Sequence, residues 1–239
     1  MIKQPIKGLI FDYGATIDSN GKHWAEVIWE GYNSVKFDIS KERFREAYVF
    51  AERALAKTPY IKPEHNFLDM LRIKMNLQLD YMSQNGFIPK DDYSLACESV
   101  AQYCYQYAGN CILKAKPVLE VLSKRYKFVL VSNFYGNIES VLSDFGLSDF
   151  FPKIVESAVV GVRKPDPKIF SLGVEAMNLA ANEIVVIGDS YSKDIVPATT
   201  IGCQTIWIKG IAWDDKEDNI SHPDIITDFS QLLSTDLMC

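Results

Sequence analysis

The sequence contains no apolar run near the roughly 20 residues that span a bilayer, no Cys-x-x-Cys pair and no basic stripe. Its N-terminus also lacks the apolar core of a signal peptide. These absences argue against a membrane-spanning protein. A net charge of −6 argues against nucleic acid as a partner. We therefore expect a cytoplasmic protein that has neither membrane nor nucleic-acid partners.

A length of 239 residues suggests one or two domains, at about 150 residues per domain. The odd number of cysteines, five, favours free thiols. Cys97, Cys104 and Cys111 recur every seven residues, which places them along one face of a helix. We interpret them as buried core thiols.

The chain begins with a feature that organises the rest. Leu9, Ile10 and Phe11 form a short, bulky apolar run, typical of a buried strand in a parallel sheet. Asp12 follows at once, and a turn of small residues comes after it. Open α/β sheets bind ligands at the carboxyl ends of their strands, so this acid is well placed for chemistry. The alternative is that Asp12 only caps the turn.

Residues 21–114 have helical periodicity and no convincing strand. Ser40 is predicted to cap a helix over 41–57. Two more helices are expected over 23–32 and 67–79, and a fourth is expected to carry the cysteines and to end near Gly109. This block is predicted to be an all-helical cap domain of four-helix-bundle type.

After residue 115 strands and helices alternate, which predicts a parallel sheet with right-handed crossovers. Strands are expected at 126–131, 153–156, 184–187 and 205–208, and a last strand and a short helix within 223–233. Helices are expected at 118–122, 138–145, 167–179 and from the residue after Asp194 to Ile201. The predicted fold is α/β, with a Rossmann-like core that has helices on both faces (residues 1–20 and 115–239) and a helical cap (residues 21–114).

Polar residues follow three of the predicted strands, and a loop adds a lysine. They are Asp12, Ser132 with Asn133, Asp189 with Asp194, and Lys164. Clustered carboxylates repel one another unless a cation is present. Mg²⁺ is the expected cation, because it takes oxygen ligands and keeps positions for a phosphate.

These motifs resemble those of the haloacid dehalogenase (HAD) superfamily, most of whose members are Mg²⁺-dependent phosphatases. The four motifs occur in the family's order, and the resemblance covers nearly the whole chain. The matching residues are Asp12 with Thr16, Ser132, Lys164 within Arg-Lys-Pro-Asp-Pro, and Gly188-Asp189 with Asp194. The helical block is similar to the family's cap, inserted just after the first motif.

The resemblance implies a role for each of these residues. Asp12 is the expected nucleophile, which forms an aspartyl-phosphate on a small phosphorylated substrate. Lys164 and Ser132 are the other expected catalytic residues. Thr16 and Asn133 join them as expected substrate-binding residues.

The resemblance also implies a Mg²⁺ site. Asp189 is expected to bind the metal directly, and Asp194 directly or through water. Asp12 and the backbone carbonyl of Gly14 complete the expected metal-binding set.

Gly14 departs from the family pattern. Family phosphatases carry a second Asp there, which protonates the leaving oxygen and later activates water. Losing a general acid–base typically lowers a rate by about 10²–10⁴-fold. The enzyme therefore uses a good leaving group, takes an acid from elsewhere such as His23 or His65, or binds a phosphorylated ligand without turnover.

Two relatives in the superfamily also lack that acid. Phosphonoacetaldehyde hydrolases use a cap lysine to form a Schiff base. Lys57, Lys62 and Lys74 lie in the predicted cap, but none has an apolar setting that singles it out. Dehalogenases need no metal, so Asp189 and Asp194 argue against them. The sequence predicts neither the substrate nor the oligomeric state.

Overall fold

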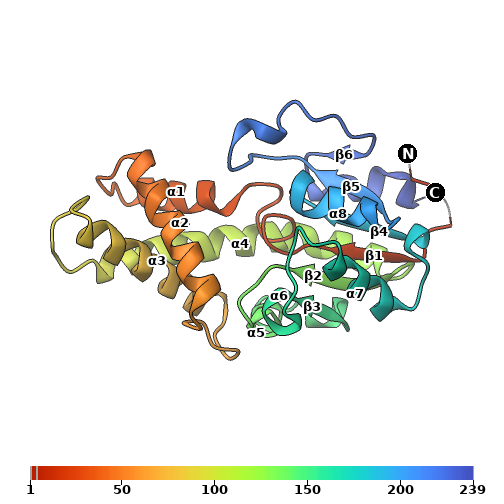
Figure 1. The fold of residues 1–239 in the computed structure, drawn as a ribbon, viewed down its shortest axis with the longest axis horizontal. Helices are drawn as coiled ribbons and strands as arrows, with labels where there is room; N and C mark the ends of the chain where they lie inside the picture. Colours follow the sequence, from red (N-terminus) through yellow and green to blue (C-terminus); the bar gives the residue numbers. More distant parts are fainter. Residues whose placement is uncertain (1, 4, 239) are drawn as a thin grey trace.

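The computed structural model describes residues 2–3 and 5–238, and it shows a sheet at one end of the molecule and a helical cap at the other (Figure 1). The six-stranded sheet is parallel in all its pairings, and its order is β3-β2-β1-β4-β5-β6. The strands are β1 Gly8–Phe11, β2 Lys127–Ser132, β3 Ile154–Glu156, β4 Ile184–Gly188, β5 Gln204–Ile208 and β6 Ile225–Ile226. The predicted α/β fold is confirmed.

Strand alternation divides the apolar side chains of the sheet between two cores. Leu9 and Phe11 of β1 belong to a core that includes Leu119 of helix α4 (Ser94–Leu122). Ile10, between them in the sequence, points into the other core, which includes Phe170 of helix α7 (Lys168–Met177). Because successive strand residues point to opposite faces, a run of bulky residues serves a sheet that is covered on both sides.

The remaining core helices are short. They are α5 Ile138–Asp144, α6 Ser157–Val160 and α8 Val196–Thr200. Helix α7 begins at Lys168, one residue after its predicted start. Asp166 Oδ1 accepts a hydrogen bond from the Lys168 N–H at 2.9 Å, just before the helix. The helix predicted after Asp194 is confirmed as α8, and a π-helical turn, Tyr191–Ile195, precedes it.

The cap contains α1 Trp24–Ser34, α2 Lys41–Lys57, α3 Phe67–Gln84 and the first part of α4 (Figure 1). Ser40 caps α2 as predicted, with its side chain accepting from the Arg43 N–H. Cys97 and Cys104 are buried and Cys111 is half-buried, and all three are free thiols. Cys239 lies outside the described residues.

The prediction that the fourth helix ends near Gly109 is wrong. Helix α4 continues as a single helix through Gly109 and Pro117 to Leu122, and it runs from the cap to the sheet (Figure 1). Glycine inside a helix costs only about 1 kcal/mol relative to alanine. The buried side chains of Ala108, Ile112 and Ala115 continue the apolar face across the proposed break, and their burial outweighs that cost. Residue 114, the predicted upper limit of the cap, therefore falls inside a helix. Within the described residues, no helix combines the length and the apolar character needed to cross a membrane.

Candidate active site

The candidate site lies where three neighbouring strands end. Asp12 follows β1, Ser132 is the last residue of β2, and Asp189 follows β4. Strands β2, β1 and β4 are adjacent and parallel, so their carboxyl ends meet at one edge. The structure brings these residues together with Lys164 and Asp194 around one cavity of about 1160 Å³.

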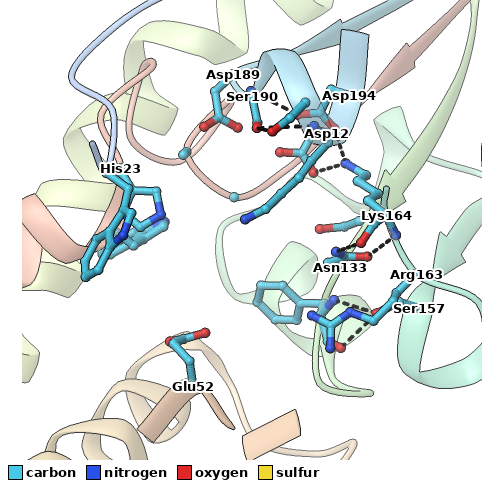
Figure 2. Close-up of a pocket in the computed structure, with 18 of the residues that line it drawn as sticks. Asp12, His23, Glu52, Asn133, Ser157, Arg163, Lys164, Asp189, Ser190 and Asp194 are labelled. Carbon is cyan, nitrogen blue, oxygen red and sulfur yellow. Dashed lines mark hydrogen bonds and ion pairs between the residues drawn. The ribbon is translucent and has the colours of Figure 1, made fainter. Parts of the chain in front are cut away.

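Lys164 contacts two of the acids at once (Figure 2). Its Nζ lies 2.6 Å from Asp12 Oδ1 and 2.6 Å from Asp194 Oδ1. All three side chains are buried, with exposed residue fractions of 5 %, 6 % and 2 % for Lys164, Asp12 and Asp194. Charged groups this deeply buried need partners, and here each carboxylate shares the same ammonium.

The Thr16 hydroxyl lies within hydrogen-bonding distance of both Asp12 and Asp189. It lies 3.2 Å from Asp12 Oδ2 and 3.4 Å from Asp189 Oδ1. Carboxylate oxygens of Asp12, Asp189 and Asp194 lie within 4.8 Å of one another. Three carboxylates and one lysine leave an excess of negative charge, and the donors are all hard oxygens. This donor set fits Mg²⁺.

Electrostatics supports the same conclusion. Burial, followed by repulsion from Asp194 and Asp12, raises the pKa of Asp189 well above its usual range. Burial and Asp12 also raise the pKa of Asp194 to about 6, although Lys164 opposes that shift. Burial alone lowers the pKa of Lys164, but Asp12 and Asp194 more than reverse this effect. Carboxylates this close to one another readily stay ionised together only when a further cation lies beside them.

Gly188 and the turn after it place Asp194. A Cβ on Gly188 would lie 2.5 Å from Cβ of Asp194, so only glycine fits at that position. Asp194 Oδ2 then accepts a hydrogen bond from the Ser190 N–H at 3.1 Å. The π-helical turn that carries Asp194 is of the kind often found at functional sites.

Asn133 fixes the loop that presents Lys164. Its Oδ1 accepts from the Lys164 N–H at 2.9 Å, and its Nδ2 donates to the Lys164 carbonyl at 3.1 Å. Asn133 therefore positions the backbone of Lys164, which occupies both ends of its side-chain amide. Ser132 is buried and lines the cavity beside them.

The turn after Asp12 is held by Asp18, which sequence analysis did not single out. Asp18 Oδ1 accepts from the Ala15 N–H at 2.7 Å, and Oδ2 accepts from Trp24 Nε1 at 2.9 Å. Ala15 has a φ of 66°, in the left-handed region that costs a residue with a Cβ free energy. Burial raises the pKa of Asp18 to about 8. Asp18 thus ties the turn after Asp12 to Trp24, the first residue of cap helix α1.

Gly14 faces open space. A Cβ added there would meet no atom within 4 Å, and the residue lines the cavity. No described atom beyond its two chain neighbours therefore crowds the first side-chain position at residue 14.

The two candidate histidines have different positions. His23 lines the cavity, and its Nδ1 accepts from the Ala25 N–H at 3.2 Å. Burial lowers the pKa of His23 to about 4, so the imidazole is neutral near pH 7 and is a weak proton donor. His65 is not among the lining residues, and its Nδ1 accepts from the Lys62 N–H at 3.1 Å.

The cap adds a charged pair that the sequence interpretation missed. Lys74 is only 5 % exposed, its Nζ lies 2.7 Å from Glu52 Oε1, and both residues line the cavity. The prediction that no cap lysine has an apolar setting is therefore wrong for Lys74, whose neighbours on α3, Met70 and Leu71, are buried too. Lys74 follows Met70 by four residues and Leu71 by three, and this spacing indicates in the sequence that it lies on the same helix face as two apolar residues.

The comparisons with known proteins agree with this geometry. The family model described as haloacid dehalogenase-like hydrolase matches residues 10–208, and the chain belongs to this family. A glyceraldehyde 3-phosphate phosphatase from Pyrococcus abyssi is 40% identical over 63 residues, which cover 26% of each chain. Haloacid dehalogenase-like hydrolase domain-containing protein 3 from Danio rerio is 36% identical over 96 residues, covering 40% of this chain and 38% of the relative.

The solved structures show the same fold over the full length. The HAD-hydrolase YfnB from Bacillus subtilis, determined bound to magnesium, superimposes with a TM-score of 0.58 at 16% identity and covers 97% of this chain and 98% of that one. The matches to the two curated relatives, by contrast, span only about a quarter to two fifths of their lengths. The chain therefore shares the family over residues 10–208 and the fold over nearly its whole length.

Proposed function

We propose that the protein is a Mg²⁺-dependent phosphatase that hydrolyses a small phosphorylated metabolite through Asp12. The observation that carries the proposal is the contact of Lys164 with both Asp12 and Asp194, beside Asp189 and Thr16, at the edge of a cavity. The phosphatase names of relatives such as the one from Pyrococcus abyssi support it. A cytoplasmic location remains a prediction.

In the proposed reaction, a carboxylate oxygen of Asp12 attacks the phosphorus atom and the bond from phosphorus to the leaving oxygen breaks. The Thr16 hydroxyl and Lys164 ammonium orient Asp12 for the attack. The leaving oxygen takes a proton from water or from the substrate. Water then attacks the aspartyl-phosphate, which releases inorganic phosphate and regenerates Asp12.

Lys164 and Ser132 stabilise negative charge on the phosphoryl oxygens during both steps. Asp12, Asp189 and Asp194 would hold Mg²⁺, since their carboxylate oxygens lie within 4.8 Å of one another. The Gly14 carbonyl is the further ligand that the family resemblance implies. When bound, the ion supplies charge neutralisation for the acids and the phosphoryl group.

The two alternative chemistries are less well supported by the described side chains. A Schiff-base lysine needs a neutral amine, but the net effect of Glu52 on the buried Lys74 is a raised pKa, which keeps it protonated. A metal-free dehalogenase gains nothing from the clustered carboxylates of Asp189 and Asp194. Phospho-ligand binding without turnover is the remaining alternative, because residue 14 is a glycine and supplies no side-chain acid.

Phosphate release from phenyl phosphate and from a panel of metabolite phosphates, with and without Mg²⁺, tests the proposal. Asp12→Asn should abolish release, while Asp149→Asn, a change of an exposed acid outside the cavity, should leave it unchanged. Mg²⁺ binding without release from any substrate would favour the binding-protein alternative.

A further inference from the structure

We propose that Glu52, Lys74 and Tyr135 bind the leaving group of the substrate, and that this group is an uncharged sugar or polyol. The inference rests on the phosphatase function proposed above and specifies its substrate class. It starts from a ring of contacts on the cap side of the cavity.

The ring joins three different elements. Lys74 Nζ on α3 lies 2.7 Å from Glu52 Oε1 on α2 and donates to the Tyr135 hydroxyl at 3.1 Å. The Tyr135 hydroxyl, from the segment after β2, donates to Glu52 Oε2 at 2.8 Å. Cap and core residues therefore contribute to one set of polar contacts. The centroid of the aromatic ring of Tyr135 also lies 5.2 Å from Lys74 Nζ.

The location of the ring suits the part of a substrate that lies beyond its phosphate. All three residues line the cavity that contains Asp12. Figure 2 shows Glu52 on the cap ribbon, on the opposite side of the pocket from Asp12, with its carboxylate directed into the pocket. A phosphate held beside Asp12 would therefore direct its leaving group toward Glu52.

The charges of Glu52 and Lys74 determine which kind of leaving group can bind beside them. Lys74 lowers the pKa of Glu52, and Glu52 keeps that of Lys74 raised, so both are charged and each neutralises the other. A carboxylate or ammonium on the substrate would have to separate this pair and leave one buried charge without a partner, which is costly. A hydroxyl can instead donate to Glu52 and accept from Lys74 while the pair stays intact.

The walls of the cavity support the same class. Tyr48 and Trp213 line it and stack with ring centroids 5.3 Å apart. Aromatic side chains in the wall supply apolar surface against which the C–H groups of a sugar or polyol can pack, and Glu52, Lys74 and Tyr135 supply polar contacts that orient it.

The test compares sorbitol 6-phosphate with phenyl phosphate, which has no hydroxyl on its leaving group. Glu52→Gln, Lys74→Met and Tyr135→Phe should each lower kcat/KM for sorbitol 6-phosphate by about 10–100-fold and that for phenyl phosphate by less than about threefold. Glu98→Gln is the matched control, because Glu98 also pairs with a cation of α3, Arg72, at 2.7 Å but does not line the cavity. It should change neither value.

Two results would overturn the inference. One is an equal loss on both substrates, which would make the ring purely structural. The other is a wild-type preference for phosphoserine or 3-phosphoglycerate over sorbitol 6-phosphate. Complete absence of phosphate release would instead contradict the proposed function; calorimetric binding of sorbitol 6-phosphate with and without Glu52→Gln would then decide the inference, since only loss of binding in the variant supports it.

Discussion

Lys164 holds Asp12 at 2.6 Å through an ammonium that is equally close to Asp194. One cation therefore compensates an acid after β1 and an acid after β4 before any metal binds. This relationship explains how a parallel sheet can collect carboxylates at one edge and still fold, since an uncompensated buried charge is strongly destabilising.

Replacing Lys164 should show that stability depends on its compensation of Asp12 and Asp194. In Lys164→Met without Mg²⁺, the free energy of unfolding should fall by about 3–5 kcal/mol, because the acids lose their partner. Phosphate release should fall by at least about 100-fold, since a donor to the phosphoryl group is gone. Urea denaturation and phosphate assays measure both effects.

The matched control for that change is Lys168→Met, an exposed lysine four residues later. It should keep the wild-type stability and rate. Mg²⁺ should raise the melting temperature of Lys164→Met more than that of the wild type, because the metal becomes the main compensating cation. An equal rise in both proteins would contradict the shared role of lysine and metal.

Gly188→Ala should disrupt the metal site without removing any residue that could hold the metal. The added methyl would lie 2.5 Å from Asp194 Cβ, so Asp194 must move. Calorimetry should show Mg²⁺ affinity lowered by about 10–100-fold, the range for disturbing groups that orient metal ligands. Gly109→Ala is the control, because its methyl would meet only Phe145 at 3.9 Å, and it should leave Mg²⁺ binding unchanged. Unchanged affinity in Gly188→Ala would show that Asp194 does not bind the metal.

Residue patterns predicted the sheet and the edge at which Asp12, Asp189 and Asp194 meet, because these depend on local apolar runs and on strand ends. They failed where the decision depended on tertiary packing. Gly109 and Pro117 indicate a break, but burial of Ala108, Ile112 and Ala115 keeps α4 continuous. The Glu52–Lys74–Tyr135 ring was missed because its members are distant in the sequence and come together only when cap and core fold.

Asp18 should make stability depend on pH. Its pKa is raised from an unfolded value near 3.8 to about 8, so between these values the folded state binds more protons than the unfolded state. The free energy of unfolding should therefore fall as pH rises from about 4 to 8, with a slope of up to about 1.4 kcal/mol per pH unit from this group. Asp18→Asn should flatten the slope, measured by urea denaturation at pH 5 and pH 8. The control Asp149→Asn should keep it; parallel slopes in all three proteins would refute the assignment to Asp18.

Gly14→Asp offers a gain of activity rather than a loss. A Cβ at this position meets nothing within 4 Å, so the first carbon of a longer side chain has room. The substitution would restore the side-chain acid that family phosphatases carry there, and the resulting general acid–base catalysis should raise kcat for alkyl phosphates by about 10²–10⁴-fold. Phenyl phosphate, whose leaving group needs less protonation, should gain much less. Gly14→Ala controls for the added bulk and should leave both rates near wild type. A fall in both rates for Gly14→Asp, with Mg²⁺ affinity unchanged, would mean that this chain obtains its proton from another source and that the open space at Gly14 belongs to the substrate.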